Sequence, residues 1–213
     1  MDDRYAKAIL EFAANECEPK GFGKVNDFQL ATDEDFNRDY PRTRNEDVRH
    51  GWMHLKEIFE TAGGYTEGDW KTAGNLDGVR LRNHRVPQRG TSGIQWCGIF
   101  ATYCWIHGQV PGVRWAFPGV AGPNVKKVWG YNGLSAGDIA VIAADNLNHH
   151  FLFVGFRNEN HGPSGIIDTI NGNSDGQSIK RGPTSRGEVT LGQVVAYYTV
   201  VVPLSEKLKS MYG

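Results

Sequence analysis

Three short stretches of this sequence carry side chains that could act together on an amide bond. The first contains Cys97, which stands at the start of a dense apolar segment of the kind that forms a buried helix. Amide groups and the dipole at the beginning of a helix stabilise a thiolate, so a cysteine in that place ionises more readily than one in a core. The alternative for Cys97 is a structural role, because unpaired cysteine is among the most buried residue types. Cys104 lies on the same helix face, two turns deeper, and we expect it in the core.

A pair of histidines opens the second stretch. His149 and His150 precede an apolar run over 151–156 that predicts a buried strand. A neutral imidazole can take the proton from a thiol and later give a proton to a leaving amine. Successive strand residues point to opposite faces of a sheet, so only one of the two rings can be aimed at Cys97. A solvated histidine in a turn is the other interpretation of either residue.

The third stretch, 170–174, ends another predicted strand and contains Asn171 and Asn173. A side-chain amide oxygen can accept a hydrogen bond from an imidazole N–H and thereby fix the tautomer and orientation of the ring. Ordinary turn formation is the alternative, since Asn followed by Gly is a strong turn signal, and Asn173 is expected to cap that turn. Each stretch is a weak signal by itself. The three in this order, each at the end of an element, are a much stronger one.

Four motifs follow one another through the carboxy-terminal two-thirds of the chain. They are Trp-Cys-Gly-Ile-Phe-Ala at 96–101, Gly-Asp-Ile-Ala-Val at 137–141, the histidine pair followed by Phe-Leu-Phe-Val-Gly, and Ile-Asn-Gly-Asn-Ser at 170–174. In this order they resemble the CHAP-type amidases and their NlpC-type relatives in the papain-like cysteine peptidase superfamily. The resemblance covers about residues 90–202. It implies a papain-like α+β fold with a nucleophilic cysteine, a histidine and a third polar residue on successive elements.

Two departures from the family pattern bear on the site. The third position is Asn171, where many relatives carry Glu or Asp, and an amide stabilises an imidazolium less than a carboxylate does. The histidine is doubled. The resemblance favours His149, because it stands six residues before Gly155, which is the spacing that relatives most often show. His150 remains the alternative base.

A mechanism follows from the resemblance. The Cys97 thiolate would attack an amide carbonyl, and protonated His149 would give its proton to the leaving amine, while Asn171 orients the imidazole. The oxyanion would be held by the backbone N–H of Cys97 and by a donor from the preceding loop, for which Gln95 and Ser92 are both candidates. Neither a metal nor another cofactor is expected.

Helices in the first half of the chain and strands in the second must position these residues. Apolar spacing predicts helices over 4–17, 46–62 and 93–107, and strands over 138–143, 151–156, 166–170 and 194–202. The stretches 18–45, 64–92 and 110–135 have the composition of loops. This order predicts an α+β fold with helices on one face of a small antiparallel sheet. We expect a helical and loop extension over 1–90 and a papain-like core over 91–213, together forming one compact domain.

Composition and charge exclude several classes of protein. The 213 residues carry a net charge of −1, which gives no electrostatic driving force for non-specific binding to nucleic acid. No apolar run is long enough for a membrane span. The 3 cysteines are odd in number and form no Cys-x-x-Cys pair, which argues against a disulfide framework and a structural zinc site. The charged amino terminus does not predict a signal peptide.

These features favour a cysteine amidase or endopeptidase that cuts the stem peptides of peptidoglycan. Such a protein would be made in the cytoplasm and would reach the cell wall or periplasm by a signal-less route, as an antibacterial effector or a phage lysin does. An effector implies an immunity protein that inhibits it. Two alternatives stay open. One is a toxin protease or deamidase with a protein substrate, and the other is a binding module whose catalytic site has decayed.

Overall fold

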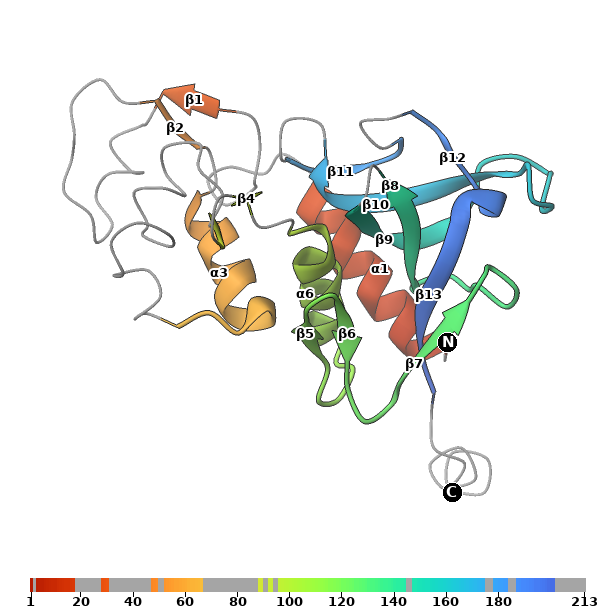
Figure 1. Cartoon of the computed structure of the whole chain (residues 1–213), viewed down its shortest axis with the longest axis horizontal. Helices are drawn as coiled ribbons and strands as arrows, with labels where there is room; N and C mark the ends of the chain where they lie inside the picture. The colour runs from red at the N-terminus through yellow and green to blue at the C-terminus, as the bar shows by residue number, and fades with distance from the viewer. Residues whose placement is uncertain are drawn as a thin grey trace.

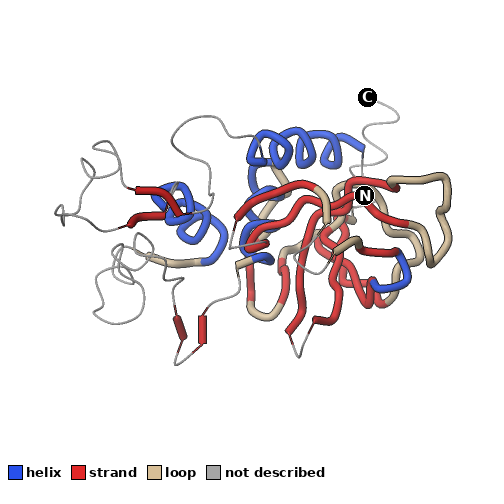
Figure 2. The backbone as a smooth tube through the Cα atoms, turned by 90° about the horizontal axis from the view of Figure 1, so that it is seen from above, coloured by secondary structure: helices blue, strands red, loops and turns tan. Residues whose placement is uncertain are grey.

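The structure is a computed structural model of the whole chain, and it shows a layer of helices beside a sheet. It describes residues 1, 3–17, 28–30, 47–49, 52–66, 88–89, 92–93, 96–144, 147–174, 178–183 and 187–201. Within these residues the α-helices are α1 (Asp3–Cys17), α3 (Trp52–Gly63) and α6 (Cys97–His107). Figure 1 shows α6 between α3 and the sheet, and Figure 2 shows helices along one side of the strands. Residues 97–105 of α6 are all buried, which is typical of a helix that is enclosed on every side.

The main sheet is antiparallel and has seven strands among the described residues. Six of them lie in the order β11-β10-β9-β8-β13-β7, and β12 pairs with β10. Their bounds are β7 Val125–Trp129, β8 Ile139–Ala144, β9 Leu147–Phe156, β10 Ile166–Ser174, β11 Ser178–Arg181, β12 Val189–Thr190 and β13 Val194–Val200. A single turn of 3-10 helix, Leu191–Gln193, joins the last two strands. The predicted α+β class is confirmed.

Three short hairpins complete the described part of the chain. They pair β1 (Phe28–Leu30) with β2 (Asp47–Arg49), β3 (Gln88–Arg89) with β4 (Ser92–Gly93), and β5 (Arg114–Ala116) with β6 (Gly119–Ala121). The expectation of loop is therefore wrong for β5, β6 and β7 within 110–135, for β1 within 18–45, and for β3 and the first residue of β4 within 64–92. The expected helix over 46–62 is also wrong at its beginning, because 47–49 form a strand and α3 begins at Trp52.

Both faces of the sheet are covered by apolar residues. Alternate residues of β8 supply the two sides: Ile139 and Val141 pack against the helices, and Ala140 and Ile142 pack on the opposite face. This alternation is the period of two that a strand imposes on its side chains. Burial of each large apolar side chain contributes roughly 1.5–3 kcal/mol to folding, so a sheet covered on both sides is a rigid base for a site.

The amino-terminal helices belong to the same apolar core as α6. Ile9 of α1 and Phe59 of α3 are fully buried in one cluster with Phe100 of α6. Gly108, just after α6, abuts Ile9 so closely that a side chain at that position would displace α1. Helices α1 and α3 therefore contribute directly to holding α6, the helix that begins with Cys97. No helix in the described part of the chain is long and apolar enough to cross a membrane.

Candidate functional site

Cys97 is the first residue of α6 and is almost completely buried. Its exposed fraction is 3%, and Trp96 before it is fully buried. The sequence predicted a helix from residue 93, but Gly93 belongs to β4 and the helix begins four residues later. This correction places the cysteine in the first turn, where the free N–H groups of the helix point towards its side chain.

The sulfur of Cys97 is seated on the backbone of β9. The N–H of His150 donates a hydrogen bond to Sγ over 3.5 Å, and the thiol lies 4.0 Å from the carbonyl oxygen of Asn148. Strand β9 pairs with β8 from Leu147 to Leu152, whereas its pairing with β10 ends at Leu152, opposite Ile170. The sulfur therefore takes a place on β9 that the peptide of a neighbouring strand would otherwise fill.

Burial raises the pKa of the Cys97 thiol above its ordinary value. The N–H groups of His150, Gly98 and Cys97 itself act in the opposite direction, as the position at a helix start predicts. Desolvation is the larger effect, because a buried thiolate loses the water that would solvate its charge. The sequence predicted that Cys97 ionises more readily than a cysteine in the core, and the directions agree: the pKa of Cys97 is raised, whereas the pKa of the fully buried Cys104 is raised well above its ordinary value. The resting side chain of Cys97 is nevertheless a neutral thiol.

His149 and Asn171 contact each other across two neighbouring strands. His149 Nε2 lies 3.0 Å from Asn171 Oδ1, and the asparagine is fully buried while the histidine is half-buried. An amide oxygen can only accept, so Nε2 carries the hydrogen and donates it. In the neutral ring this leaves Nδ1 with the lone pair that a base needs. The backbone groups that hold Cys97 Sγ belong to the residues on either side of His149.

His150 has different surroundings. It is 3% exposed, its ring packs edge to face on Trp115 with centroids 5.1 Å apart, and it stacks on Tyr198 at 6.1 Å. Burial, with a smaller contribution from His149, lowers its pKa to about 4. Of the two rings, His149 has the amide partner that the predicted mechanism requires, and His150 is a neutral part of the packing.

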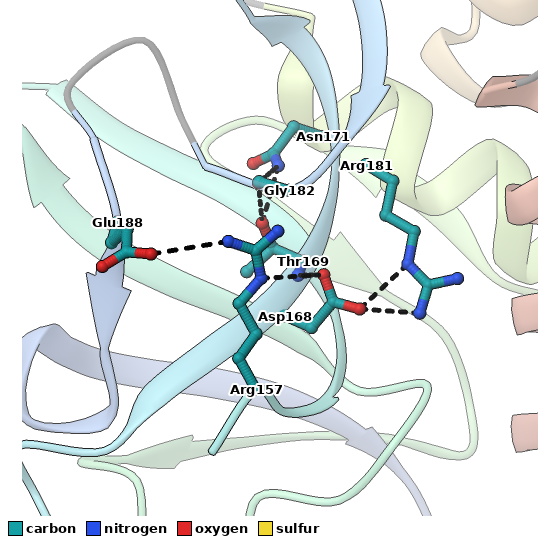
Figure 3. A network of polar contacts seen from close by, with 7 residues as sticks. All are labelled: Arg157, Asp168, Thr169, Asn171, Arg181, Gly182 and Glu188. Atoms are coloured by element: carbon teal, nitrogen blue, oxygen red, sulfur yellow. Dashed lines mark hydrogen bonds and ion pairs between the residues drawn. The ribbon is translucent and has the colours of Figure 1, made fainter.

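Asn171 is held by three hydrogen bonds on both ends of its side chain. Its Nδ2 donates to Thr169 Oγ1 over 2.7 Å and to the carbonyl oxygen of Gly182 over 3.1 Å (Figure 3). Its Oδ1 accepts from His149. Both partners of Nδ2 act as acceptors here. The site therefore suits an amide at position 171, although many members of the resembling family carry a carboxylate there.

The alternative of a turn at Asn171–Gly172 is wrong, because both residues lie inside β10, which continues to Ser174. The packing explains why Asn-Gly is extended here: a side chain at position 172 would collide with Phe100 of α6, so a glycine lets the strand approach the helix. Asn173 has a positive φ of 56° and lies where the pairing of β10 with β11 becomes irregular. Its backbone angle places it at a bend in the strand, not in the expected turn.

The two candidate oxyanion donors cannot be compared side by side. Gln95 lies outside the described residues, and Ser92 is described only as backbone in β4. Both therefore stay predictions from the sequence. The backbone N–H of Cys97, the other predicted donor, is at the first turn of α6, next to the sulfur.

Two further residues belong to the surroundings of the site. Trp115 lies on β5, and its indole covers Gly98 so closely that a Cβ there would be 2.2 Å from the ring. Thr169, which binds Asn171, was missed by sequence reasoning. The only signal for Thr169 was its position two residues before Asn171, which puts both side chains on one face of a strand.

No family model, curated protein or solved structure matches this chain. The assignment of the site therefore depends on the order of its motifs and on the contacts described above. Among the described residues, no group of three His, Cys, Asp or Glu side chains is placed to hold a metal ion. These contacts place the thiol of Cys97 on the backbone at either side of His149, and they place the imidazole of His149 on the amide of Asn171.

Proposed function

We propose that this protein is a cysteine hydrolase that cleaves an amide bond, with Cys97 as the nucleophile and His149 as the general base and acid. The observation that carries the proposal is the 3.0 Å contact between His149 Nε2 and Asn171 Oδ1, beside the backbone that holds Cys97 Sγ. The four motifs in their order support a papain-like fold of the CHAP or NlpC kind. The burial of α6 against β9 and β10 is consistent with that fold.

The reaction has two halves. In the first, His149 Nδ1 takes the thiol proton while Sγ of Cys97 bonds to the amide carbonyl carbon, and the N–H of Cys97 stabilises the oxyanion. The C–N bond then breaks as the imidazolium gives its proton to the leaving amine. In the second half, water attacks the thioester, with His149 accepting a proton from the water and returning one to the sulfur. Asn171 keeps the ring oriented throughout.

The neutral resting thiol determines when the proton moves. Because burial raises the pKa of Cys97, a free thiolate is scarce at neutral pH, and transfer to His149 belongs to the step in which substrate binds. A substrate amide that displaces the sulfur from the β9 backbone would start that transfer.

The substrate class that we propose is the stem peptide of bacterial peptidoglycan, with the protein acting at the wall or in the periplasm as an effector or lysin. This part of the proposal is supported by the resemblance of the motifs. An immunity protein is the partner expected of an effector. A toxin protease or deamidase would use the same residues on a protein, so the substrate decides between them.

Purified sacculi, followed by analysis of the released muropeptides, test the reaction and the substrate together. Wild-type protein is expected to release new muropeptides, Cys97→Ala none, and His149→Ala roughly 10²–10⁴-fold less. Cys17→Ala is the matched control, since it removes a half-buried cysteine from α1 and leaves the site intact. Identical products from wild type and Cys97→Ala would contradict the assignment of the nucleophile.

A parallel toxicity assay separates the two substrate classes. Wild type and Cys97→Ala are directed to the cytoplasm or to the periplasm of the same bacterial cells. Killing by the wild type in the periplasm alone supports the wall as the substrate. Killing in the cytoplasm with unchanged muropeptides supports a protein substrate instead.

One observation favours the second candidate function, a binding module with a decayed site: Cys97 is only 3% exposed. Alkylation by iodoacetamide, followed by mass spectrometry, distinguishes the two. In a working hydrolase, His149 assists removal of the thiol proton, so His149→Ala slows alkylation of Cys97 at neutral pH. If wild type and His149→Ala react equally slowly, the binding module is the better description.

A further inference from the structure

Asn171, Thr169 and Gly182 form a chain of hydrogen bonds in which each donor and each acceptor can be assigned. The hydroxyl of Thr169 donates its single hydrogen to the carbonyl oxygen of Gly182 over 2.7 Å, and that carbonyl can only accept (Figure 3). Thr169 Oγ1 is left as an acceptor and receives a hydrogen from Asn171 Nδ2 over 2.7 Å. The second hydrogen of Nδ2 goes to the same carbonyl over 3.1 Å.

These bonds leave Asn171 one orientation. Rotating the side-chain amide by half a turn would set Oδ1 against the Gly182 carbonyl, which cannot donate, and Nδ2 against the ring nitrogen of His149. The Thr169 hydroxyl would have to leave that carbonyl to donate to Oδ1. These hydrogen bonds are shielded from solvent, because Thr169 is 1% exposed and Asn171 is 0% exposed. An unsatisfied polar group costs about 1–3 kcal/mol in such surroundings, so the flipped amide is strongly disfavoured.

The carbonyl at the end of the chain is itself held in place. The N–H of Gly182 donates to the carbonyl oxygen of Thr169 over 2.8 Å, so these two residues bind each other through backbone and side chain. Gly182 has a φ of 109°, a backbone conformation that favours glycine. Next to it, Arg181 binds Asp168 through two nitrogens, which ties β11 to β10.

We propose that Thr169 is a positioning residue that, through Asn171, sets the tautomer of His149 to the one with hydrogen on Nε2 and the lone pair on Nδ1. Thr169 does not touch the reacting atoms. An effect of Thr169 on the rate of catalysis rests on the proposed function, because the tautomer of His149 affects the rate only if His149 is catalytic. The tautomer itself can be measured whether or not the protein is a hydrolase.

The chain also makes position 171 selective for an amide. A carboxylate would place an oxygen that cannot donate against the Gly182 carbonyl, and it would draw the Thr169 hydroxyl away from that carbonyl. Asn171→Asp is therefore expected to lower the midpoint of urea unfolding, although aspartate is common at this place in the resembling family. An Asn171→Asp variant as stable as the wild type would overturn this selectivity.

Long-range ¹H–¹⁵N NMR of histidine-labelled protein is the direct test, because the two tautomers have different ¹⁵N shifts. The His149 signals are assigned by their loss in His149→Gln. The wild type and Thr169→Ser, which keeps the hydroxyl, are expected to show hydrogen on Nε2 above the pKa of the ring. Thr169→Val is expected to show a mixture of tautomers. Thr199→Val, on β13, is the matched control for the loss of a threonine hydroxyl.

The rate of Cys97 alkylation by iodoacetamide, measured as a function of pH, gives the second readout. Thr169→Val is expected to react about tenfold more slowly, far less than the roughly 10⁴-fold loss that a fixed wrong tautomer causes in a serine protease. Thr169→Ser should restore the rate.

The outcomes separate the two claims. Hydrogen on Nδ1 in the wild type, or an unchanged tautomer in Thr169→Val, overturns the inference. If Thr169→Val does not fold, the wild-type and Thr169→Ser spectra still decide it. A mixed tautomer with an unchanged alkylation rate supports the positioning role but contradicts His149 as the base, and so counts against the proposed function alone.

Discussion

A histidine is largely buried among the helices and another is buried against the sheet, and their pKa values are shifted in opposite directions. His54 lies among α1, α3 and α6, where Nε2 contacts Glu16 and Nδ1 lies 3.2 Å from Glu57 Oε2. Burial by itself would lower its pKa, but the hydrogen bonds and charges of the two carboxylates outweigh burial and the pKa is raised. His150 lies between the sheet and the β5–β6 hairpin among aromatic rings, and its pKa is lowered to about 4.

The difference shows that the partners of a buried group decide its charge. The cluster around His54 includes the hydroxyl of Tyr103, which donates to Glu57 Oε1 over 2.9 Å and so joins α3 to α6. Helix α6 is thus held on one side by a charged cluster and on the other by apolar packing around a neutral ring. Cys97 lies in the second layer, and its pKa is raised for the same reason that the pKa of His150 is lowered: both lose charge on burial.

The largest expected effect is the change of stability with pH that comes from His150, on the apolar side of this comparison. A histidine whose folded pKa is about 4 stabilises the protein above its ordinary value of 6.5, and that stability is lost as the pH falls towards 4. Relative to His150→Phe, the wild type should therefore lose about 3 kcal/mol of unfolding free energy between pH 7 and pH 4. Urea unfolding of both proteins across this range measures it.

The comparison with a variant is needed because Asp138 acts in the opposite direction. Burial raises the pKa of Asp138 to about 6, so its contribution to stability is present at low pH and is lost as the pH rises through that value. Equal pH dependence in the wild type and His150→Phe would mean that folding does not lower the pKa of His150. His150→Leu serves as a second variant if the phenyl ring does not fit.

A smaller effect is expected on the charged side, because burial and the two carboxylates partly cancel at His54. Its raised pKa means that the contribution to stability is present below the ordinary value of 6.5 and is lost as the pH rises through the folded value. His54→Gln should remove this slope, as urea unfolding between pH 6 and pH 8 can show. A wild type that gains stability from His54 as the pH rises would reverse the comparison.

The smallest effect is expected at a solvent-exposed ion pair, which extends the comparison from buried to exposed charges. The side chain of Arg181 is 54% exposed and binds Asp168 at 2.7 Å. Arg181→Gln is expected to cost less than about 1 kcal/mol, and the cost should shrink in 1 M salt because exposed charges are screened. A larger loss that is insensitive to salt would show that the pair holds the β10–β11 edge in a way that exposure does not predict.

The sequence was sufficient to predict the residues that meet at the site, because each of them has a local signal. Cys97 begins an apolar segment, the histidines precede a strand, and Asn171 stands beside a glycine. Those signals place all three at or near element ends in a mixed fold. Cys97 does begin α6, whereas the histidines and Asn171 lie inside the longer strands β9 and β10. Cys104, expected in the core, is fully buried.

What the sequence did not predict depends on tertiary contacts. The strands β5 and β6 have three residues each, too few for a period of two to be recognised among so many Gly and Pro residues. The requirement for glycine at position 172 comes from Phe100, which is 72 residues away in the chain. The raised pKa of Cys97 follows from burial by β9, and the dipole argument for a helix start contains no information on burial.

The contact between Trp115 and Gly98 has a consequence for the evolution of this protein. A methyl group at position 98 would occupy the space of the indole, so alanine there requires a smaller residue at position 115. The two positions are separated by 17 residues yet should change together in related chains. In a related chain with other residues at both positions, the surface beside the start of α6 would have a different shape, and a different preference for substrates is expected.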